Sequence, residues 1–174
     1  MAKSRRKLIA GLTQPKYALL QDLTDQAVLD APTLEAALVQ AVDDRFALAR
    51  GFVDAAKVLA ASQDPIVRRS AVSRAYYGAY HAARAVVFAV HRRDEKDHDK
   101  VAQGVDALLR RQGSLQTALK ELRDLRNEMD YSPYPGPDDE TEYEADEIEG
   151  AIGDTIRKTQ GLIGEFDGFL KGRR

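Results

Sequence analysis

Apolar side chains recur along most of the chain at steps of three and four residues, and no alternating pattern of the strand type persists. Such steps place the side chains on one face of a helix, so the pattern predicts an all-α protein. Its two longest stretches cover residues 33–62 and 65–91. We therefore expect an up-and-down bundle of four or five helices with short connections.

Residues typical of helix ends divide this pattern into elements. Asp64 followed by Pro65 is typical of a helix start, and the prolines of SPYPGP must end the helix before them. We expect the last helix to begin near Asp138, because carboxylates in a first turn are favoured by the helix dipole. The expected helices cover residues 17–29 after Pro15, 33–62 with Thr33 as N-cap, 65–91, 100–111, 114–129 with Ser114 as N-cap, and the segment from 138 onward.

Glycines are unusually frequent inside the last expected helix, where each costs up to about 1 kcal/mol relative to alanine. Two explanations are open: a neighbouring helix approaches them closely, or the terminal segment is loosely ordered. We favour the close approach. The glycines concerned are Gly150, Gly153, Gly161, Gly164 and Gly168.

The 174-residue chain, 44% hydrophobic, is long enough for one domain with a sizeable core. We expect a basic N-terminal extension with a short helix over residues 1–32, and a helical bundle over residues 33–172. The net charge of −2 argues against a protein coated in basic charge for binding duplex DNA. Residues 3–7 are nevertheless basic, and residues 137–150 are strongly acidic.

Composition also excludes several kinds of site. No apolar run approaches the roughly 18 to 20 residues that a membrane helix needs, so we expect no membrane association and a cytoplasmic location. The absence of cysteine excludes disulfides, thiolate nucleophiles and cysteine-bound metals. With only three histidines as well, we expect no metal and no cofactor.

The stretch SRAYYGAYHAARAVV (residues 73–87) is unusually rich in tyrosine for an alanine-rich helix. Small and branched side chains recur on one side of it together with Tyr76, which predicts a core-facing stripe. A second stripe on another side holds Ser73, Tyr77, Tyr80, His81, Arg84 and Phe88. The second stripe either packs inside the bundle against the terminal helix, or forms a subunit interface, or contacts nucleic acid. For the last two functions the candidate binding residues are Tyr77, His81 and Arg84.

A further group of polar side chains lies in the hexapeptide RNEMDY. As a structural network, Arg126 would pair with Asp130 four residues later, Asn127 would satisfy helix-end carbonyls and Tyr131 would anchor the proline-rich turn. As a functional cluster, the same four residues would bind phosphate or a nucleotide, with Arg123 one turn earlier. Both interpretations remain open at this point.

These two stretches carry a resemblance to a known family. SRAYYGAYHAARAVV closely resembles the helix motif of small HEPN-domain proteins, and LRDLRNEMDYSPY (residues 122–134) resembles the arginine-containing segment that follows it. His98, between them, falls where many members of this subgroup carry a histidine. The resemblance implies a helical bundle, commonly a homodimer and often paired with a minimal nucleotidyltransferase in toxin–antitoxin or defence systems. Active members are metal-independent ribonucleases that use an arginine and a histidine closely following it, gathered across the dimer.

The chain departs from that catalytic pattern. Arg126 matches the arginine, but no histidine follows His98, and Tyr131 stands in its place. Histidine is suited to accept the proton of an RNA 2′-hydroxyl, whereas a phenol, with an ordinary pKa near 10, is a poor base. Arginine-to-histidine spacings elsewhere, such as Arg93 to His98 in a link that we expect to be solvated, are expected by chance.

We therefore expect a dimeric HEPN-like binding module with a degenerate ribonuclease motif, whose ligand is RNA or a nucleotide. The alternative is an active ribonuclease in which Tyr131, Asp130 or His98 replaces the usual histidine beside Arg126. A scaffold without such a ligand is the third possibility. Candidate catalytic residues are Arg126, Asn127, Asp130 and Tyr131, and candidate binding residues are Tyr77, His81, Arg84 and Arg123.

Overall fold

The computed structural model describes residues 5–26, 30–133, 135–136 and 143–173, and within them it contains helices and no strand. The helices are α1 (Arg5–Ala10), α2 (Gln14–Asp25), α3 (Ala31–Ala60), α4 (Pro65–His91), α5 (His98–Leu109), α6 (Ser114–Tyr131) and α7 (Ala145–Lys171). The all-α prediction is confirmed. No helix among the described residues combines the length and the apolar character needed to cross a membrane.

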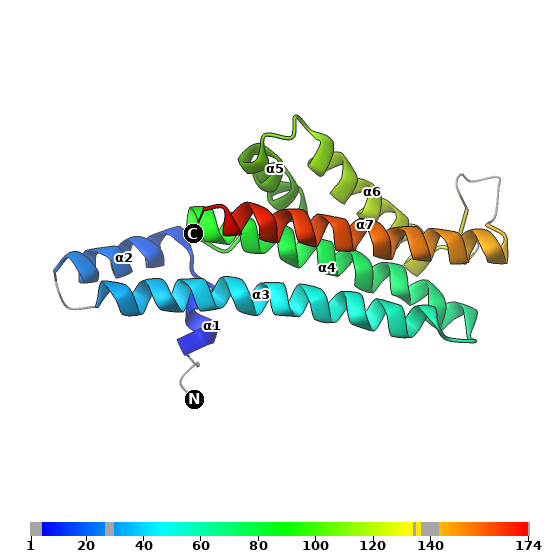
Figure 1. Cartoon of the computed structure of the whole chain (residues 1–174), viewed down its shortest axis with the longest axis horizontal. Coiled ribbons are helices and arrows are strands. Elements are labelled where there is room, and N and C mark those ends of the chain that lie inside the picture. Colours follow the sequence, from blue (N-terminus) through cyan, green and yellow to red (C-terminus); the bar gives the residue numbers. More distant parts are fainter. Residues whose placement is uncertain (1–4, 27–29, 134, 137–142, 174) are drawn as a thin grey trace.

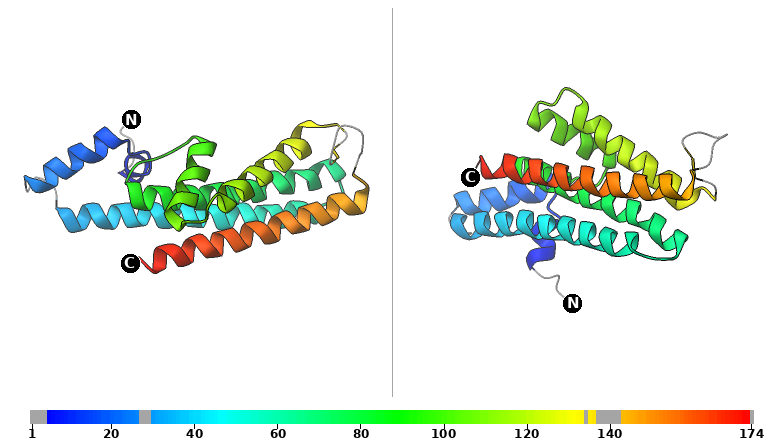
Figure 2. Two further views of the ribbon diagram at one scale, coloured as in Figure 1. Left: turned by 90° about the horizontal axis from the view of Figure 1, so that it is seen from above. Right: turned by 45° about the vertical axis from the view of Figure 1, so that its right-hand side comes forward.

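Helix α4 is the centre of the bundle. It contacts α3, α5, α6 and α7, and the three long helices α3, α4 and α7 run side by side (Figure 1). Helices α5 and α6 lie together against another side of α4, as the second pair of views shows (Figure 2). The expected bundle of four or five helices thus corresponds to α3–α7.

Small side chains let α3 and α7 approach α4 closely. A Cβ atom added to Gly78 would lie 3.1 Å from the Ala49 carbonyl oxygen of α3 and 3.3 Å from a methyl group of Thr159 of α7. The buried Thr159 hydroxyl in turn donates to the Ala75 carbonyl at 3.2 Å. The alanine-rich composition of this helix is therefore explained by helix–helix packing around its axis.

The helix starts follow ordinary capping chemistry, although two expected caps are wrong. Asp64 caps α4 as expected and accepts from the Ile66 amide at 2.8 Å. Thr33 lies inside α3, where its amide donates at 2.9 Å to Asp30, the true N-cap. Ser114 is already helical, because Gly113 is the N-cap of α6.

An acidic side chain from another helix takes over the capping of α6. Asp106 of α5 accepts from the amides of Gly113 at 2.7 Å and Leu115 at 2.9 Å. At α7 the N-cap is Glu144, which forms a capping box with Glu147. The expected start at Asp138 lies outside the described residues.

The α7 glycines do not lie against another helix of this chain. Nothing among the described residues comes within 4 Å of a Cβ atom added at Gly150, Gly161, Gly164 or Gly168, and the Gly153 position meets only the neighbouring Arg157 side chain. The expected close approach is therefore wrong within the described protomer.

The N-terminal extension takes part in the core. Helix α1 is formed by residues that we expected to belong to a basic tail. Ile9 in this helix and Leu12 after it are both buried, and Leu12 is only 3% exposed. Helix α2 follows, beginning at Gln14 rather than at residue 17, and has no fully buried residue. It ends at Asp25, and its expected end at Leu29 lies outside the described part of the chain.

Candidate functional site

The second stripe of α4 is less exposed than a binding surface would be. Ser73, Tyr80 and Phe88 are buried, and only Tyr77, His81 and Arg84 remain half-buried. Tyr76 lies in the core, as predicted. The half-buried members contact Phe52 of α3, Arg126 of α6 and Asp94 of the α4–α5 link.

Arg84 is held by an aspartate of the α4–α5 link. Its Nε and one terminal nitrogen donate to the two carboxylate oxygens of Asp94 at 2.8 and 2.5 Å, and Arg45 of α3 donates to the same carboxylate at 2.7 Å. The Asp94 side chain is 4% exposed. The Asp94 carboxylate is therefore buried, contrary to the expectation of a solvated link, whereas Arg93, Lys96 and Asp97 of the same link are exposed. Two nitrogens of Arg84 are already paired with it.

The same network attaches the N-terminal extension. The Arg45 guanidinium also donates to the Ala10 carbonyl and lies 4.4 Å from the centre of the Phe88 ring, while the Asp94 amide donates to the Leu12 carbonyl at 2.7 Å. We refer to Arg45, Arg84, Phe88 and Asp94 as the Asp94 cluster. The Asp94 carboxylate at its centre is buried and pairs with both guanidinium groups, while one terminal nitrogen of Arg45 is buried without a hydrogen bond to any described residue. A carboxylate enclosed in this way indicates a structural function.

His81 lies between α3 and α4 and is kept neutral. Its ring stacks on Phe52 with centroids 5.3 Å apart and meets Tyr80 edge-on at 5.3 Å. Burial, followed by the charges of Arg84 and Arg45, lowers the pKa of His81 to about 4. At neutral pH the imidazole is an aromatic packing group without charge.

The structure brings the RNEMDY residues together with Tyr77. Arg126 donates to the Tyr77 hydroxyl at 3.0 Å and to the Asn127 side chain at 2.7 Å. Its Nε lies 3.1 Å from Asp130, and its guanidinium lies 5.3 Å from the centre of the exposed Tyr131 ring. The predicted Arg126–Asp130 pair is present, while the contact with Tyr77 joins α6 to α4.

His98 joins this group from α5. It is the first residue of that helix, its Nδ1 shares a hydrogen bond with the Tyr76 hydroxyl, and its ring stacks on Tyr80 at 4.1 Å. Burial, followed by the charges of Arg123 and Arg126, lowers its pKa. Sequence reasoning placed His98 in a solvated link. The signal that could have found its position is the preceding Asp97, which caps α5.

Arg123 completes the group beside His98. Its guanidinium pairs with Asp99 at 2.8 Å, and a shallow pocket of about 30 Å³ opens between the histidine and Arg123, with Lys120 also on its wall. We refer to Tyr76, Tyr77, His98, Arg123, Arg126 and Asp130 as the α6 cluster. Its carboxylate is more open than that of the Asp94 cluster, since the Asp130 side chain is 22% exposed and that of Asp94 is 4% exposed.

Sequence reasoning missed one residue that supports the α6 cluster. Arg69 of α4 donates from Nε to the Met129 carbonyl at 2.9 Å and from a terminal nitrogen to the Ser132 carbonyl at 2.5 Å. It thereby satisfies carbonyls that the end of α6 leaves without helical partners. No local pattern distinguishes Arg69 from the other arginines of α4.

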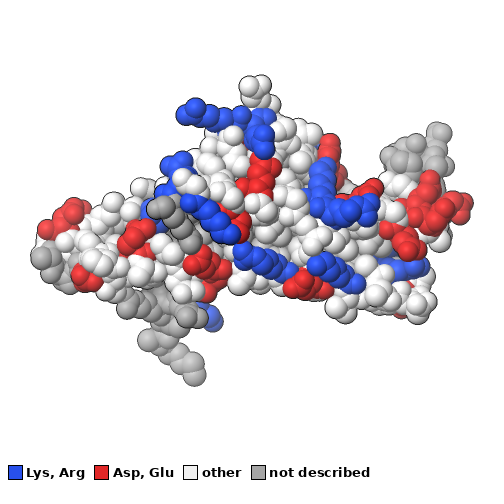
Figure 3. Space-filling model, in the orientation of Figure 1, with Lys and Arg blue, Asp and Glu red and all other residues white. Residues whose placement is uncertain are grey.

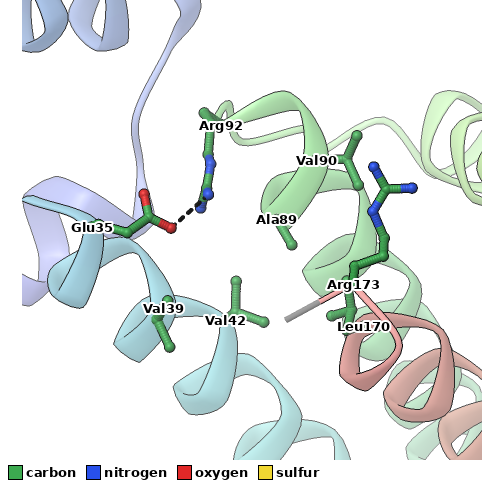
Figure 4. A pocket seen from close by; sticks show the side chains of 8 residues that line it. All are labelled: Glu35, Val39, Val42, Ala89, Val90, Arg92, Leu170 and Arg173. Atoms are coloured by element: carbon green, nitrogen blue, oxygen red, sulfur yellow. Dashed lines mark hydrogen bonds and ion pairs between the residues drawn. The ribbon is translucent and has the colours of Figure 1, made fainter.

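A larger hollow of about 540 Å³ lies at the other end of the bundle, away from the α6 cluster. Figure 4 shows Glu35 of α3 and Arg92 joined by an ion pair of 2.7 Å, with Val42 and the α7 residues Leu170 and Arg173 around the hollow. It contains none of the residues that the sequence selected.

The charged surface is mixed. On the face shown in Figure 3, basic and acidic side chains are interspersed rather than gathered into one basic surface. Acidic side chains collect where α7 begins, with Asp146 and Glu147 in its first turn. No group of three or more potential metal ligands occurs among the described residues.

Comparison with known proteins identifies one relationship. The family model described as the HEPN domain matches residues 42–157, from the middle of α3 to the middle of α7. All members of the two clusters lie within this match. The Ala10 and Leu12 carbonyls, which accept hydrogen bonds from Arg45 and Asp94, lie outside it. No curated protein and no solved structure matches the chain.

Proposed function

The chain belongs to the HEPN family, which confirms the resemblance seen in its sequence, and from this premise we propose that it is a homodimeric binding module for RNA or a nucleotide. In this proposal Arg126 binds a phosphate of the ligand, and the ribonuclease motif is degenerate.

The observation that carries the proposal is the state of Arg126. The Tyr77 hydroxyl and Asp130 hold its guanidinium in place, and its buried Nε lies 3.1 Å from the Asp130 carboxylate. A fixed guanidinium is suited to phosphate, because its donors match the phosphate oxygens. No histidine accompanies it on α6, so the arginine half of a ribonuclease site is present without the usual base.

The surface beside Arg126 supports a homodimer. Leu48 of α3 is 47% exposed and lies one turn from Phe52, which contacts Tyr77 at 5.8 Å between ring centroids. Tyr131 of α6 is 71% exposed on the far side of Arg126. Exposed apolar and aromatic side chains are common at interface centres, and in this proposal a second copy covers them so that two Arg126 side chains face one another.

Within this proposal the protein acts with a partner protein, a minimal nucleotidyltransferase, in a toxin–antitoxin or defence-type system. Family membership and the resemblance of the two motifs to paired HEPN proteins support this step. Copurification of the chain with the product of a neighbouring gene would test it.

The experiment that tests the function compares Arg126→Gln with Arg157→Gln. Arg157 is an exposed arginine of α7 that pairs with Asp154, so it is a matched control for the lost charge. We expect sedimentation to show a dimer, and single-stranded RNA to bind Arg126→Gln about tenfold more weakly than wild type. Equal RNA affinities of the two variants, or a wild-type protein that binds neither RNA nor a mononucleotide, would contradict the proposal.

The second candidate function is an active ribonuclease, favoured by the position of His98 near the two α6 arginines. Asp130 and Tyr131 are the other groups that could accept the proton. This alternative requires RNA cleavage by purified protein that Arg126→Ala abolishes.

A further inference from the structure

His98 has a hydrogen bond that determines which of its two nitrogens carries the proton. The partner is the hydroxyl group of Tyr76, a residue 3% exposed in the core. Burial raises the pKa of Tyr76, so the phenol stays protonated. A buried hydroxyl that donates to nothing is costly, and among the described residues His98 Nδ1 is the acceptor that it meets.

The hydroxyl of Tyr76 therefore donates and Nδ1 accepts. Because the lowered pKa keeps the imidazole neutral at pH 7, its single proton lies on Nε2. Stacking of the ring on Tyr80 fixes the direction of that N–H group. His98 is thus organised as a hydrogen-bond donor, whereas a general base would need a free lone pair at Nε2.

The surroundings of His98 favour an anion. Arg123 and Lys120 line the same pocket as its ring, and the charges of Arg123 and Arg126 lower its pKa. In the present structure the carboxylate of Asp99 occupies the Arg123 guanidinium at 2.8 Å, yet its side chain is 64% exposed and free to turn into solvent. Asp99 is therefore a stand-in for an oxyanion at this position.

We infer that His98 and Arg123 form a second phosphate subsite, one turn of α6 away from Arg126, in which the imidazole donates from Nε2. The inference rests on the proposed function and deepens it, because it extends the phosphate contact of Arg126 to a neighbouring phosphate group. Residues three apart on a helix have Cβ atoms about 5 to 6 Å apart, so one strand running along α6 can contact both arginines. The pocket of about 30 Å³ beside the ring is large enough for a phosphate oxygen, which is close to a water molecule in size.

The first test reads the proton position directly. The chain contains three histidines, His81, His91 and His98, so ¹⁵N–¹H spectra of the imidazoles are simple to assign. We expect the free dimer to show the His98 proton on Nε2. Tyr76→Phe, which keeps the ring and removes the hydroxyl, should move part of that proton to Nδ1. A wild-type proton on Nδ1 would overturn the inference.

The second test titrates the full-length protein with inorganic phosphate. We expect phosphate to shift the His98 Nε2 and Arg123 Nε resonances and to leave exposed His91 unchanged. His98→Phe should weaken phosphate binding about tenfold, because one donor to a charged group is lost. Asp99→Asn should strengthen it several-fold, and the matched control Asp154→Asn, in an exposed pair on α7, should leave it unchanged.

The exposed Asp99 variant keeps the test decisive even if His98→Phe is unstable. Unchanged phosphate affinity in Asp99→Asn together with unmoved His98 resonances would overturn the subsite. That result is distinguishable from failure of the proposed function, which shows instead as RNA binding that does not depend on Arg126.

Discussion

The Asp94 cluster and the α6 cluster are built from the same kinds of side chain, and each includes side chains of α4. Each contains two arginines, a carboxylate and aromatic rings. In the Asp94 cluster one carboxylate is shared by two guanidinium groups and its side chain is 4% exposed. In the α6 cluster Arg123 and Arg126 each have a separate carboxylate, and those side chains are 64% and 22% exposed.

This difference shows what separates a structural arginine from a candidate functional one. The Nε and one terminal nitrogen of Arg84 are paired with Asp94, and an incoming ligand would have to displace a carboxylate that is only 4% exposed. Arg123 holds a carboxylate that an incoming anion can displace at little cost. Two polar clusters of similar composition can therefore differ in function. What distinguishes them is whether an incoming anion can displace the carboxylates that pair with their arginines.

Removing the shared carboxylate should produce the largest effect. In Asp94→Asn, Arg45 and Arg84 remain buried without a counter-charge, which costs about 3 to 5 kcal/mol of unfolding free energy. Urea denaturation measures this loss. The control is Asp124→Asn, which breaks an exposed i,i+4 pair with Lys120 and should change stability by less than about 0.5 kcal/mol. Similar small losses in both variants would remove the distinction between the two clusters.

A pH titration should produce the next largest effect, through His81. Its pKa is depressed from 6.5 to about 4, so the unfolded chain takes up a proton before the folded chain does. The free energy of unfolding is therefore unaffected by protonation of His81 above about pH 6.5, and it declines as the pH falls from there toward 4. Because the ring is partly solvated, we expect a loss of about 1 kcal/mol between about pH 7.5 and pH 5.

The variant His81→Phe isolates this contribution, since it keeps the stacking on Phe52 and cannot titrate. The difference in urea stability between wild type and His81→Phe should change by about 1 kcal/mol over that pH range. Parallel pH profiles of the two proteins would show that His81 is not held neutral between α3 and α4.

Replacing the guanidinium of the open cluster should cost less stability than Asp94→Asn. Arg126→Gln loses a half-buried pair whose remaining partners, Tyr77 and Asp130, can be hydrated, so we expect a loss of about 1 kcal/mol in urea denaturation. A loss as large as that of Asp94→Asn would assign Arg126 a structural function and weaken the phosphate proposal.

The sequence predicted the fold well because helix faces are local patterns. Periodicity located α3, α4, α6 and α7, and Asp64 before Pro65 marked the start of α4 correctly. It also predicted the Arg126–Asp130 pair, which depends only on spacing within one helix. What it could not predict are contacts made between distant segments.

Asp94 and His98 illustrate this limit. A run of charged residues between two helices reads as solvated, yet Asp94 is drawn inward by Arg45 from α3 and Arg84 from α4. His98 joins the α6 cluster because it shares a hydrogen bond with Tyr76 and stacks on Tyr80, both of which belong to another helix. The α7 glycines are the opposite case, since their frequency suggested a neighbouring helix and the described protomer provides none beside them.

The smallest stability effect, and the sharpest test of the open surface, is expected for Tyr131→Ala. The ring is 71% exposed and contacts Arg126 through its face, which is worth about 0.5 kcal/mol to the protomer. If a second copy covers this surface, the same change should raise the dimer dissociation constant about tenfold or more, because buried tyrosines dominate interfaces. Leu19→Ala, on α2 and 58% exposed, is the matched control and should leave dimerisation unchanged. Sedimentation over a dilution series distinguishes the variants, and equal dissociation constants would mean that the second copy binds elsewhere.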